Sequence, residues 1–410
     1  MILLAPGDYL VLLEIFLFLA VAQFIRIAAQ KVGFPEIVAD LLAGMILGAY
    51  ALGGVVNGLL GVPIFGLQSG LLLFADLSVV LLLFSAGLGA GVTSLRRAGI
   101  AAIGAAIAGD LLAFGITFAV FSRFYPTDSA LFLGVAAAAT SAAVSVSLLR
   151  SEQLGGTPGV QLFLHASALD DVVALVLLSS VTAYLAGSQD PLRLTGTVVT
   201  SVVAWVVLLV ASVVIIPRLL RWRVLARVET LPFTILFVVI AIVLALGFSP
   251  IIGAYVAGLA VAESVAAPRT RLLTEVLVGI FGALFFIVVG AEFEAGLLRD
   301  PLLLGFALLL AATAAVGKFA GVYPFARQRL HDDGAARAIA AGMIPRGEIG
   351  LLVGSIGFAS GFLSETMLGE VVLMSIFTTL IGSLLFRHYA SHLREDPREV
   401  HGSTMSPVVR

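Results

Sequence analysis

The stretch LHASALDDVVALV at residues 164–176 places two adjacent carboxylates, Asp170 and Asp171, inside an apolar run. Across residues 160–183 the only other ionisable side chain is that of His165. A run of this length can cross a bilayer as a helix, and the two acids then lie near its middle. A carboxylate there costs roughly 2.5–3.5 kcal/mol on insertion scales, so such acids usually face water, a partner or a transport pathway. We therefore expect Asp170 and Asp171 to be functional; the alternative is a pair that only holds helices together.

The two acids are neighbours in the sequence, yet they need not share an environment. Consecutive helix positions lie about 100° apart, so Asp170 and Asp171 cannot serve one partner in the same way. We expect one carboxylate to face a water-filled cavity and the other to turn toward a neighbouring helix. His165, which precedes them on the same run, either lines that cavity or tunes a response to pH.

The composition is that of a membrane protein. Of the 410 residues, 60% are hydrophobic and only 12% are charged, whereas about a quarter of an average soluble domain is charged. The formal net charge is −2 and the basic residues form no stripe, so no nucleic-acid partner is expected. There is no cysteine, which excludes disulfides and Cys-ligated metals, and five scattered histidines provide no metal cluster. No nucleophile–base arrangement indicates an enzyme, and we expect no cofactor.

Apolar runs long enough to span a bilayer recur along the chain. Helices of roughly 17–25 apolar residues can cross the hydrocarbon core. The sequence predicts an all-α polytopic protein with a membrane domain over residues 1–390 and a short cytoplasmic tail over 391–410. Its thirteen predicted spans are 9–30, 35–50, 70–91, 99–121, 129–149, 160–185, 195–217, 232–247, 250–266, 274–290, 301–322, 336–358 and 367–388.

The basic residues orient these spans. With the N-terminus outside, an odd number of spans places the C-terminus in the cytoplasm. Eighteen Lys and Arg residues then lie on the inner side, against only Arg123, Arg193 and Arg299 on the outer side. Such an excess is typical of cytoplasmic loops. We expect a multi-pass protein of the cell (inner) membrane, with its N-terminus outside and its C-terminus in the cytoplasm.

A faint internal repeat relates the two halves. PEIVADLLAGMILG at residues 35–48 and PIIGAYVAGLAVAE at 250–263 both begin at a proline and reach an Ala-Gly pair about eight residues later. These are the second and ninth spans, an odd number apart, so the two copies point in opposite directions. Spans 1–6 and 8–13 are then inverted repeats with span 7 as connector, an arrangement typical of transporters.

The fifth span of each half resembles a discontinuous helix. VAAAATSAAVSVSLLR at residues 135–150 concentrates hydroxyl side chains among small residues, and MIPRGEIGLLV at 343–353 surrounds Arg346 with proline and glycine. Proline removes a backbone donor and glycine permits unwinding. Carbonyl groups freed at such breaks can coordinate a cation. The glycine-rich GLGAG at 87–91 lacks the strand–turn–helix context of a nucleotide loop, so we interpret it as close helix packing.

Several other charges lie within apolar runs and need partners. For Lys318 the obvious partner is Asp170 or Asp171, and the alternative is snorkelling to the cytoplasmic surface. We interpret Arg346 and Glu348 as a buried structural pair that holds a helix break together, rather than as transport ligands.

Asp110 lies in the middle of the fourth span. A buried carboxylate at this depth needs a partner. We expect Arg346 or a broken-helix amide to supply it. Whether this role is structural or functional stays open.

At this point the motifs resemble a known family. They run through nearly all of residues 10–390, and the chain is similar to the monovalent cation:proton antiporter superfamily, in particular its second subfamily of bacterial sodium/proton antiporters and potassium-efflux relatives. The segments that carry the resemblance are PEIVADLLAGMILG (35–48), LLFSAGL (82–88), the Asp170–Asp171 pair, GAYVAGLAVAE (253–263), FFIVVGAEF (285–293), GKF (317–319) and MIPRGEIGLLV (343–353).

The resemblance implies a thirteen-helix homodimer with a dimer domain and a core domain, crossed broken helices 5 and 12, and elevator-like alternating access. It implies that Asp171 carries the cation (Na⁺) and the proton, that Asp170 can pair with Lys318, and that Thr140 and Ser141 help to coordinate the ion. Members with Asp-Asp and this lysine are typically electrogenic. The chain ends about twenty residues after the last span without a nucleotide-binding regulatory domain, which argues against the gated potassium-efflux type.

We therefore expect sodium/proton exchange, with lithium as a possible substrate and a role in pH homeostasis. A dehydrated sodium ion and a proton would compete for Asp171. Lys318 would hold Asp170 ionised in one state and lose its own proton in another, which gives a second proton per cycle. Potassium/proton exchange is the main alternative. A cation channel and an organic-anion symporter are more distant ones, because exposed paired carboxylates would repel an anion.

Overall fold

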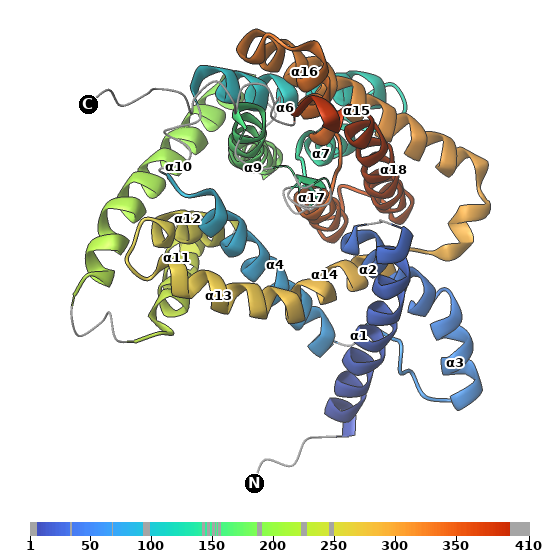
Figure 1. Cartoon of the computed structure of the whole chain (residues 1–410). Coiled ribbons are helices and arrows are strands. Elements are labelled where there is room, and N and C mark those ends of the chain that lie inside the picture. The colour runs from blue at the N-terminus through green and yellow to red at the C-terminus, as the bar shows by residue number, and fades with distance from the viewer. Residues whose placement is uncertain are drawn as a thin grey trace, which may run out of the picture.

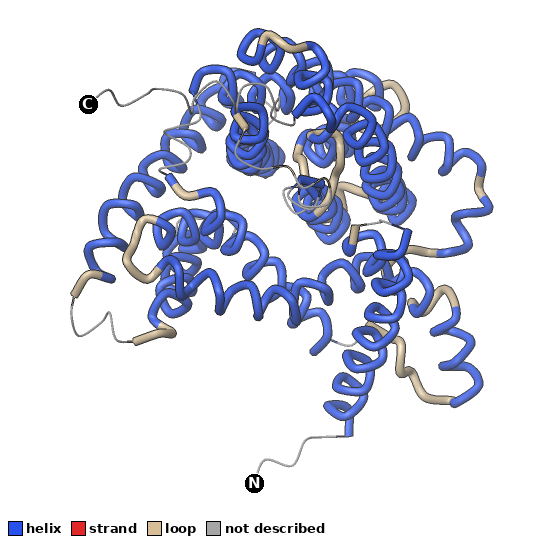
Figure 2. Tube along the Cα trace, in the orientation of Figure 1, coloured by secondary structure: helices blue, strands red, loops and turns tan. Residues whose placement is uncertain are grey.

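Helices joined by loops and turns make up the part of the chain that the computed structural model describes (Figure 2). No strand occurs in the described residues, which confirms the predicted all-α class. The described residues are 6–32, 35–67, 69–92, 99–141, 144–145, 148–149, 152, 154, 157–186, 191–222, 228–245 and 250–393. Most of the predicted tail at 391–410 lies outside them.

The helices follow one another with short connections. The helices are α1 Pro6–Val32, α2 Glu36–Leu47, α3 Leu52–Leu60, α4 Ser69–Ala90, α6 Gly99–Phe121, α7 Thr127–Ala138, α9 Pro158–Ala186, α10 Pro191–Leu220, α11 Leu231–Ala245, α12 Pro250–Ala262, α13 Ala267–Leu277, a π-helical turn Val278–Gly282, α14 Ala283–Ala291, a 3₁₀ turn Ala295–Arg299, α15 Pro301–Leu330, α16 Asp333–Gly342, α17 Glu348–Ala359, α18 Glu365–Tyr389 and a 3₁₀ turn Ala390–Leu393.

Each predicted span contains helix where the structure describes it, although the fifth and twelfth spans are interrupted and the second and ninth end early. Among the described residues, eight stretches are long and apolar enough to cross a bilayer: Tyr9–Lys31, Glu36–Leu60, Ser69–Ala90, Gly99–Phe121, Pro158–Leu185, Ala267–Ala291, Pro301–Leu330 and Glu365–Leu393. The sequence did not predict α3, because nine residues with three glycines are too short to cross the hydrocarbon core.

The helices form two bundles (Figure 1). The first bundle contains α1, α2, α4 and α10–α14, in which α4 packs against α12 and α2 packs against α14. The second bundle contains α6, α7, α9 and α15–α18, in which α6 packs against α15 and α18 packs against both α15 and α16. The bundles meet where α9 contacts α10 and α4, and where α14 contacts α17. Asp170 and Asp171 lie on α9 and so belong to the second bundle.

Glycines set the closest helix contacts in the first bundle. A Cβ atom on Gly87 of α4 would meet the carbonyl oxygen of Tyr255 on α12, and one on Gly258 of α12 would meet the carbonyl of Phe84 on α4. The packing interpretation of GLGAG therefore holds for Gly87, whereas a Cβ atom on Gly89 would meet nothing within 4 Å. In the same way, a Cβ on Gly44 of α2 would meet the carbonyl of Ile287 on α14. Larger residues at these positions would force the helices apart.

The chain leaves helical geometry at both predicted breaks. Helix α7 ends at Ala138, and residues 139–141 are not helical. Helix α16 ends at Gly342, residues 343–347 are not helical, and α17 begins at Glu348. The two breaks touch, because the backbone N–H of Ser141 donates a hydrogen bond to the carbonyl of Pro345 at 2.9 Å.

Candidate functional site

The two adjacent acids of α9 are both buried, but they lie in different surroundings. The side chains of Asp170 and Asp171 have 0% and 3% of their surface exposed. The carboxylate of Asp170 points into the second bundle. It accepts a hydrogen bond from the backbone N–H of Thr140 at 2.7 Å and forms an ion pair with Lys318. This contact matches the partner expected for Lys318.

Lys318 does not snorkel to the surface, because its side chain is fully buried on α15. Its ammonium group contacts three acceptors. It donates to the carboxylates of Asp170 and Asp110 and to the carbonyl of Ala138 at 2.8 Å. An ammonium has three N–H groups, so this set satisfies it completely.

The expected partner of Asp110 is wrong. We predicted Arg346 or a broken-helix amide, whereas the carboxylate of Asp110 pairs with Lys318. The reason is the close packing of α6 on α15, where Gly317 and Gly321 leave no room for a Cβ atom against the backbone of α6. This approach brings the middle of α6 directly against Lys318. The contact between Asp110 and Lys318 could not be inferred from their separation in the sequence.

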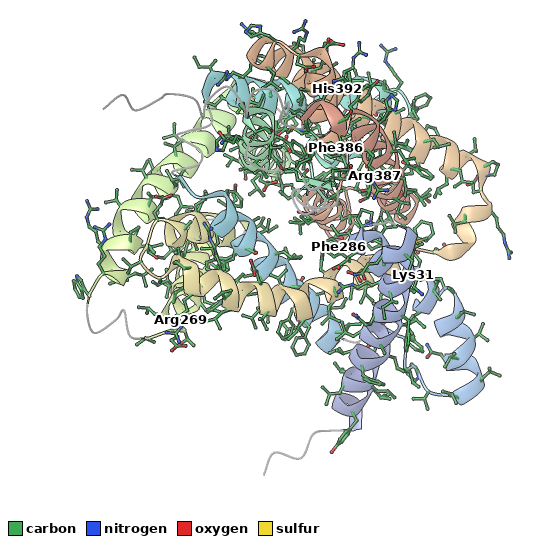
Figure 3. All side chains as sticks on the ribbon, in the orientation of Figure 1. Lys31, Arg269, Phe286, Phe386, Arg387 and His392 are labelled. Atoms are coloured by element: carbon green, nitrogen blue, oxygen red, sulfur yellow. The ribbon has the colours of Figure 1, made fainter. Side chains whose placement is uncertain are left out.

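Asp171 faces a cavity between the two bundles. The cavity has a volume of about 920 Å³. Its walls come from α1, α2, α4, α9, the α13–α14 segment and α17, and Phe286, labelled in Figure 3, lines it from α14. Within the described residues, the structure gives the Asp171 carboxylate no ion pair or hydrogen bond. The Asp171 carboxylate is therefore buried, without a partner among the described residues, on the wall of a cavity large enough to hold water.

Polar side chains line the path from this cavity to the surface. His165 lies on its wall one and a half turns before Asp171, as the lining interpretation predicted. At the ends of α1 and α2, the guanidinium of Arg26 donates to both carboxylate oxygens of Asp40, at 2.7 and 2.6 Å. Glu36, an exposed residue, lines the same end. Because these lining residues reach the surface, the cavity connects Asp171 with the exterior on this side.

Glu348 also lines the cavity, at the first position of α17. Its carboxylate accepts a hydrogen bond from the hydroxyl of Ser141 at 2.7 Å. Two acids from different helices, Asp171 and Glu348, therefore face the same space. An arrangement of this kind attracts cations and disfavours anions.

The predicted pair between Arg346 and Glu348 is not formed. Arg346 is fully buried, and its guanidinium donates instead to the carbonyls of Met343 and Ala314, both at 3.1 Å. The unwinding of residues 343–347 frees carbonyl groups that need donors, and the guanidinium binds that of Met343. Its second acceptor, Ala314, lies within α15. Glu348 lies beyond the break and turns toward the cavity. Their closeness in sequence suggested a contact that the break prevents.

Thr140 and Ser141 lie at the crossing of the two breaks rather than on the cavity wall. The hydroxyl of Thr140 donates to the carbonyl of Met343 at 3.0 Å, and the hydroxyl of Ser141 is held by Glu348. In this conformation both hydroxyls tie the two breaks together. Neither is among the residues that line the cavity.

Charged groups compensate the ends of the interrupted helices. Lys318 donates to the carbonyl of Ala138 at the C-terminal end of α7, and Arg346 does the same for Met343 after α16. Glu348 occupies the N-terminal end of α17. Cations at helix C-termini and anions at N-termini are favoured by the helix dipole. Lys318 and Arg346 thus compensate two C-terminal ends and Glu348 one N-terminal end, while Asp171 faces the cavity.

One neighbour of the site was missed from the sequence. Tyr255 of α12 is fully buried, and its hydroxyl donates to the carbonyl of Ala168 on α9 at 3.1 Å. It therefore joins the first bundle to the helix that carries Asp171. Its position within the repeated segment 250–263 was the only available signal.

The family-wide sequence pattern described as "Sodium/hydrogen exchanger, transmembrane" matches residues 16–391. The chain belongs to the sodium/hydrogen exchanger family. This confirms the expected resemblance to cation:proton antiporters and a membrane antiporter function of the sodium/proton type. Members of the family are transporters rather than enzymes.

Individual members of the family are similar over most of their length. A Na(+)/H(+) antiporter of Enterococcus hirae is 27% identical over 368 residues, which cover 88% of this chain and 93% of the relative. The Na(+)/H(+)-K(+) antiporter GerN of Bacillus cereus is 26% identical over 357 residues, covering 86% and 89%.

A solved structure shares the fold. The sodium proton antiporter MjNhaP1 of Methanocaldococcus jannaschii aligns with a TM-score of 0.71 at 17% identity, covering 94% of this chain and 97% of that one.

Proposed function

We propose that this family member exchanges sodium for protons by alternating access, with both ions competing for Asp171. The observation that carries the proposal is the contrast between two neighbours. Asp170 is held by Lys318 and Thr140, whereas Asp171 faces the cavity without an ion pair among the described residues. A buried carboxylate without a partner is unfavourable, and either a proton or a dehydrated monovalent cation neutralises it.

Each remaining site residue has a distinct proposed role. Lys318 holds Asp170 in this state, and the coupled Lys318–Asp170 pair supplies the second proton of an electrogenic cycle. Thr140 and Ser141 join the ion's coordination when the crossed breaks rearrange. Arg346 holds the break between α16 and α17 against α15 by binding the carbonyls of Met343 and Ala314.

We propose thirteen spans arranged as inverted repeats, spans 1–6 and 8–13, with α10 as the connector. The helix contacts support this symmetry, because helices in equivalent positions of the two halves make equivalent contacts with the other half. The second span, α2, packs on the tenth, and the ninth, α12, packs on the third. The fourth and eleventh spans, α6 and α15, pack on each other, and the two broken spans touch at Ser141 and Pro345. Related pairs of this kind are expected from an inverted repeat.

The positive-inside pattern supports an outside N-terminus and a cytoplasmic C-terminus in the inner membrane. With that orientation, Arg26, Glu36 and Asp40 mark the cytoplasmic end, so the cavity opens inward in this conformation. We propose that the second bundle is the mobile core domain and that the first bundle forms the homodimer. Transport then moves Asp171 past the first bundle.

Potassium is the second candidate substrate. One relative, GerN, is named as a Na(+)/H(+)-K(+) antiporter, and the size selectivity of such a site depends on carbonyl geometry that charge alone does not determine.

Purified protein in proteoliposomes with an internal pH dye tests the proposal. An imposed sodium gradient should drive proton movement of the opposite direction, and reversing the gradient should reverse it. Parallel runs with lithium and potassium rank the substrates. Sodium-independent proton flux, or conductance of sodium without proton coupling, would contradict exchange and indicate a channel.

A further inference from the structure

Asp110 is the one acid of the Lys318 cluster to which the exchange cycle above gives no role. It lies on α6, is fully buried, and one of its oxygens, Oδ1, contacts the ammonium of Lys318. Its other oxygen, Oδ2, is buried without a hydrogen-bond partner. Buried polar atoms are nearly always satisfied, so an unpaired carboxylate oxygen beside an ammonium requires an explanation.

The helices that carry Asp110 and Lys318 form a fixed pair. Gly109, next to Asp110, leaves space for the stem of Lys318, because a Cβ atom there would lie 3.0 Å from its Cδ atom. On α15, Gly317 and Gly321 bring the backbones of the two helices into contact. A further hydrogen bond of 3.0 Å joins the hydroxyls of Thr117 and Thr313 across the same interface. These contacts, which do not involve α9, hold Asp110 beside Lys318.

Asp170, by contrast, is carried by α9, and it must leave Lys318 if it is to contribute to binding a cation next to Asp171. Its departure would free one of the three N–H groups of a fully buried ammonium. Removing a buried charge from its partner is strongly unfavourable. Oδ2 of Asp110 is an unpaired acceptor on a carboxylate that already contacts the same ammonium through Oδ1.

We propose that Asp110 is a positioning residue that sets the affinity for the transported cation by holding Lys318 when Asp170 releases it. This inference rests on the proposed function, since it assumes that Asp170 turns toward the cation. In the cation-free state Asp110 shares Lys318 with Asp170. In the cation-bound state it takes the ammonium with both oxygens.

Loss of the Asp110 charge should weaken cation binding and leave the maximal rate of transport nearly unchanged. In D110N, Asp170 is the only carboxylate left for Lys318, so the cation has to compete against a tighter pair. We expect the KM for sodium to rise at least about tenfold while the maximal rate stays within about twofold. D110E, which restores the carboxylate, should return KM toward the wild-type value.

A control variant and a second genetic background separate this role of Asp110 from a structural one. E370Q removes another fully buried carboxylate, whose partner is the hydroxyl of Tyr125 at 2.5 Å rather than Lys318, and should leave KM for sodium unchanged. In a K318Q background, D110N should change KM by less than about twofold, because the group that Asp110 positions is gone.

The experiment measures sodium-driven proton transport in proteoliposomes for wild type, D110N, D110E, E370Q, K318Q and D110N/K318Q. A wild-type-like KM in D110N, or an equal rise in both backgrounds, would overturn the role of Asp110. If D110N does not fold, a KM for sodium in D110N/K318Q that differs by more than about twofold from that of K318Q rejects the proposal. Absence of sodium coupling in the wild type itself would instead refute the proposed function.

Discussion

Asp170 and Asp171 are consecutive residues of one helix that serve opposite sides of it. Asp170 accepts from Lys318 and from the backbone N–H of Thr140 inside the second bundle, whereas Asp171 lies on the wall of the cavity between the bundles. The 100° turn between neighbouring helix positions makes this division possible. In this conformation one acid binds the protein's own groups and the other faces the cavity.

Replacing Lys318 by glutamine should change both stability and charge movement. K318Q leaves Asp110 and Asp170 as buried carboxylates without a cation, which costs about 3–5 kcal/mol. We expect a lower Tm of the purified protein and weaker or absent voltage dependence of transport, measured at imposed membrane potentials. Unchanged electrogenicity in K318Q would reject the role of the Lys318–Asp170 pair.

Arg346 and Glu348 should behave as independent residues. Arg346→Met removes the guanidinium from the carbonyls of Met343 and Ala314, and losing a hydrogen bond to a charged group costs about 1.5–3 kcal/mol. Glu348→Gln keeps a hydrogen bond to Ser141 and should cost little. In a double-mutant cycle by thermal unfolding, the two penalties should add within about 0.5 kcal/mol. A coupling energy of several kcal/mol would instead indicate the ion pair between Arg346 and Glu348 that the sequence suggested.

The contact of α4 with α12 should not tolerate a side chain at Gly258. Gly258→Val places its Cβ atom against the carbonyl oxygen of Phe84, and an overpacked interface of this kind costs about 1–3 kcal/mol or more. Size-exclusion profiles and Tm of the purified variant should show the loss. Gly115→Ala is the matched control, because nothing lies within 4 Å of a Cβ atom there. Equal behaviour of the two variants would contradict the packing described above.

Glu292, just after the end of α14, should make stability depend on pH. Burial, together with the nearby charge of Asp76, raises the pKa of Glu292 from 4.5 to about 7. A pKa that is higher in the folded than in the unfolded chain favours the folded state at low pH, and this contribution is lost as pH rises from 4.5 through 7.

The glutamine of E292Q cannot ionise, so the Tm of this variant should fall less than that of the wild type between pH 5 and pH 8. The pH-dependent free energy of unfolding that Glu292 contributes is below about 3 kcal/mol, because the carboxyl is partly exposed. Parallel Tm curves for the two proteins would show that Glu292 does not titrate in this range.

The helices and the central acids could be predicted because membrane physics leaves few alternatives. A chain must form continuous apolar helices to cross a bilayer, and a carboxylate in such a helix is conspicuous. The breaks after Ala138 and Gly342 were likewise visible, since proline, glycine and clustered hydroxyls have direct backbone consequences.

The partners of the buried charges could not be predicted with the same success. Asp110 and Lys318 are 208 residues apart, and their contact depends on how glycines let α6 approach α15. For Arg346, proximity to Glu348 in the sequence was misleading, because a carbonyl freed by the break and one on α15 bind the guanidinium instead. Three-dimensional packing, rather than local sequence, decides which charge meets which.

Competition at Asp171 is tested most directly by comparing wild type and Asp171→Asn in proteoliposomes across pH. In the wild type, the KM for sodium should rise as the pH falls, because protons occupy the carboxylate that sodium needs. D171N should show no sodium-driven proton movement at any pH, while its size-exclusion profile stays like that of the wild type. Substantial exchange by folded D171N, or a wild-type KM for sodium that does not depend on proton concentration, would contradict the account.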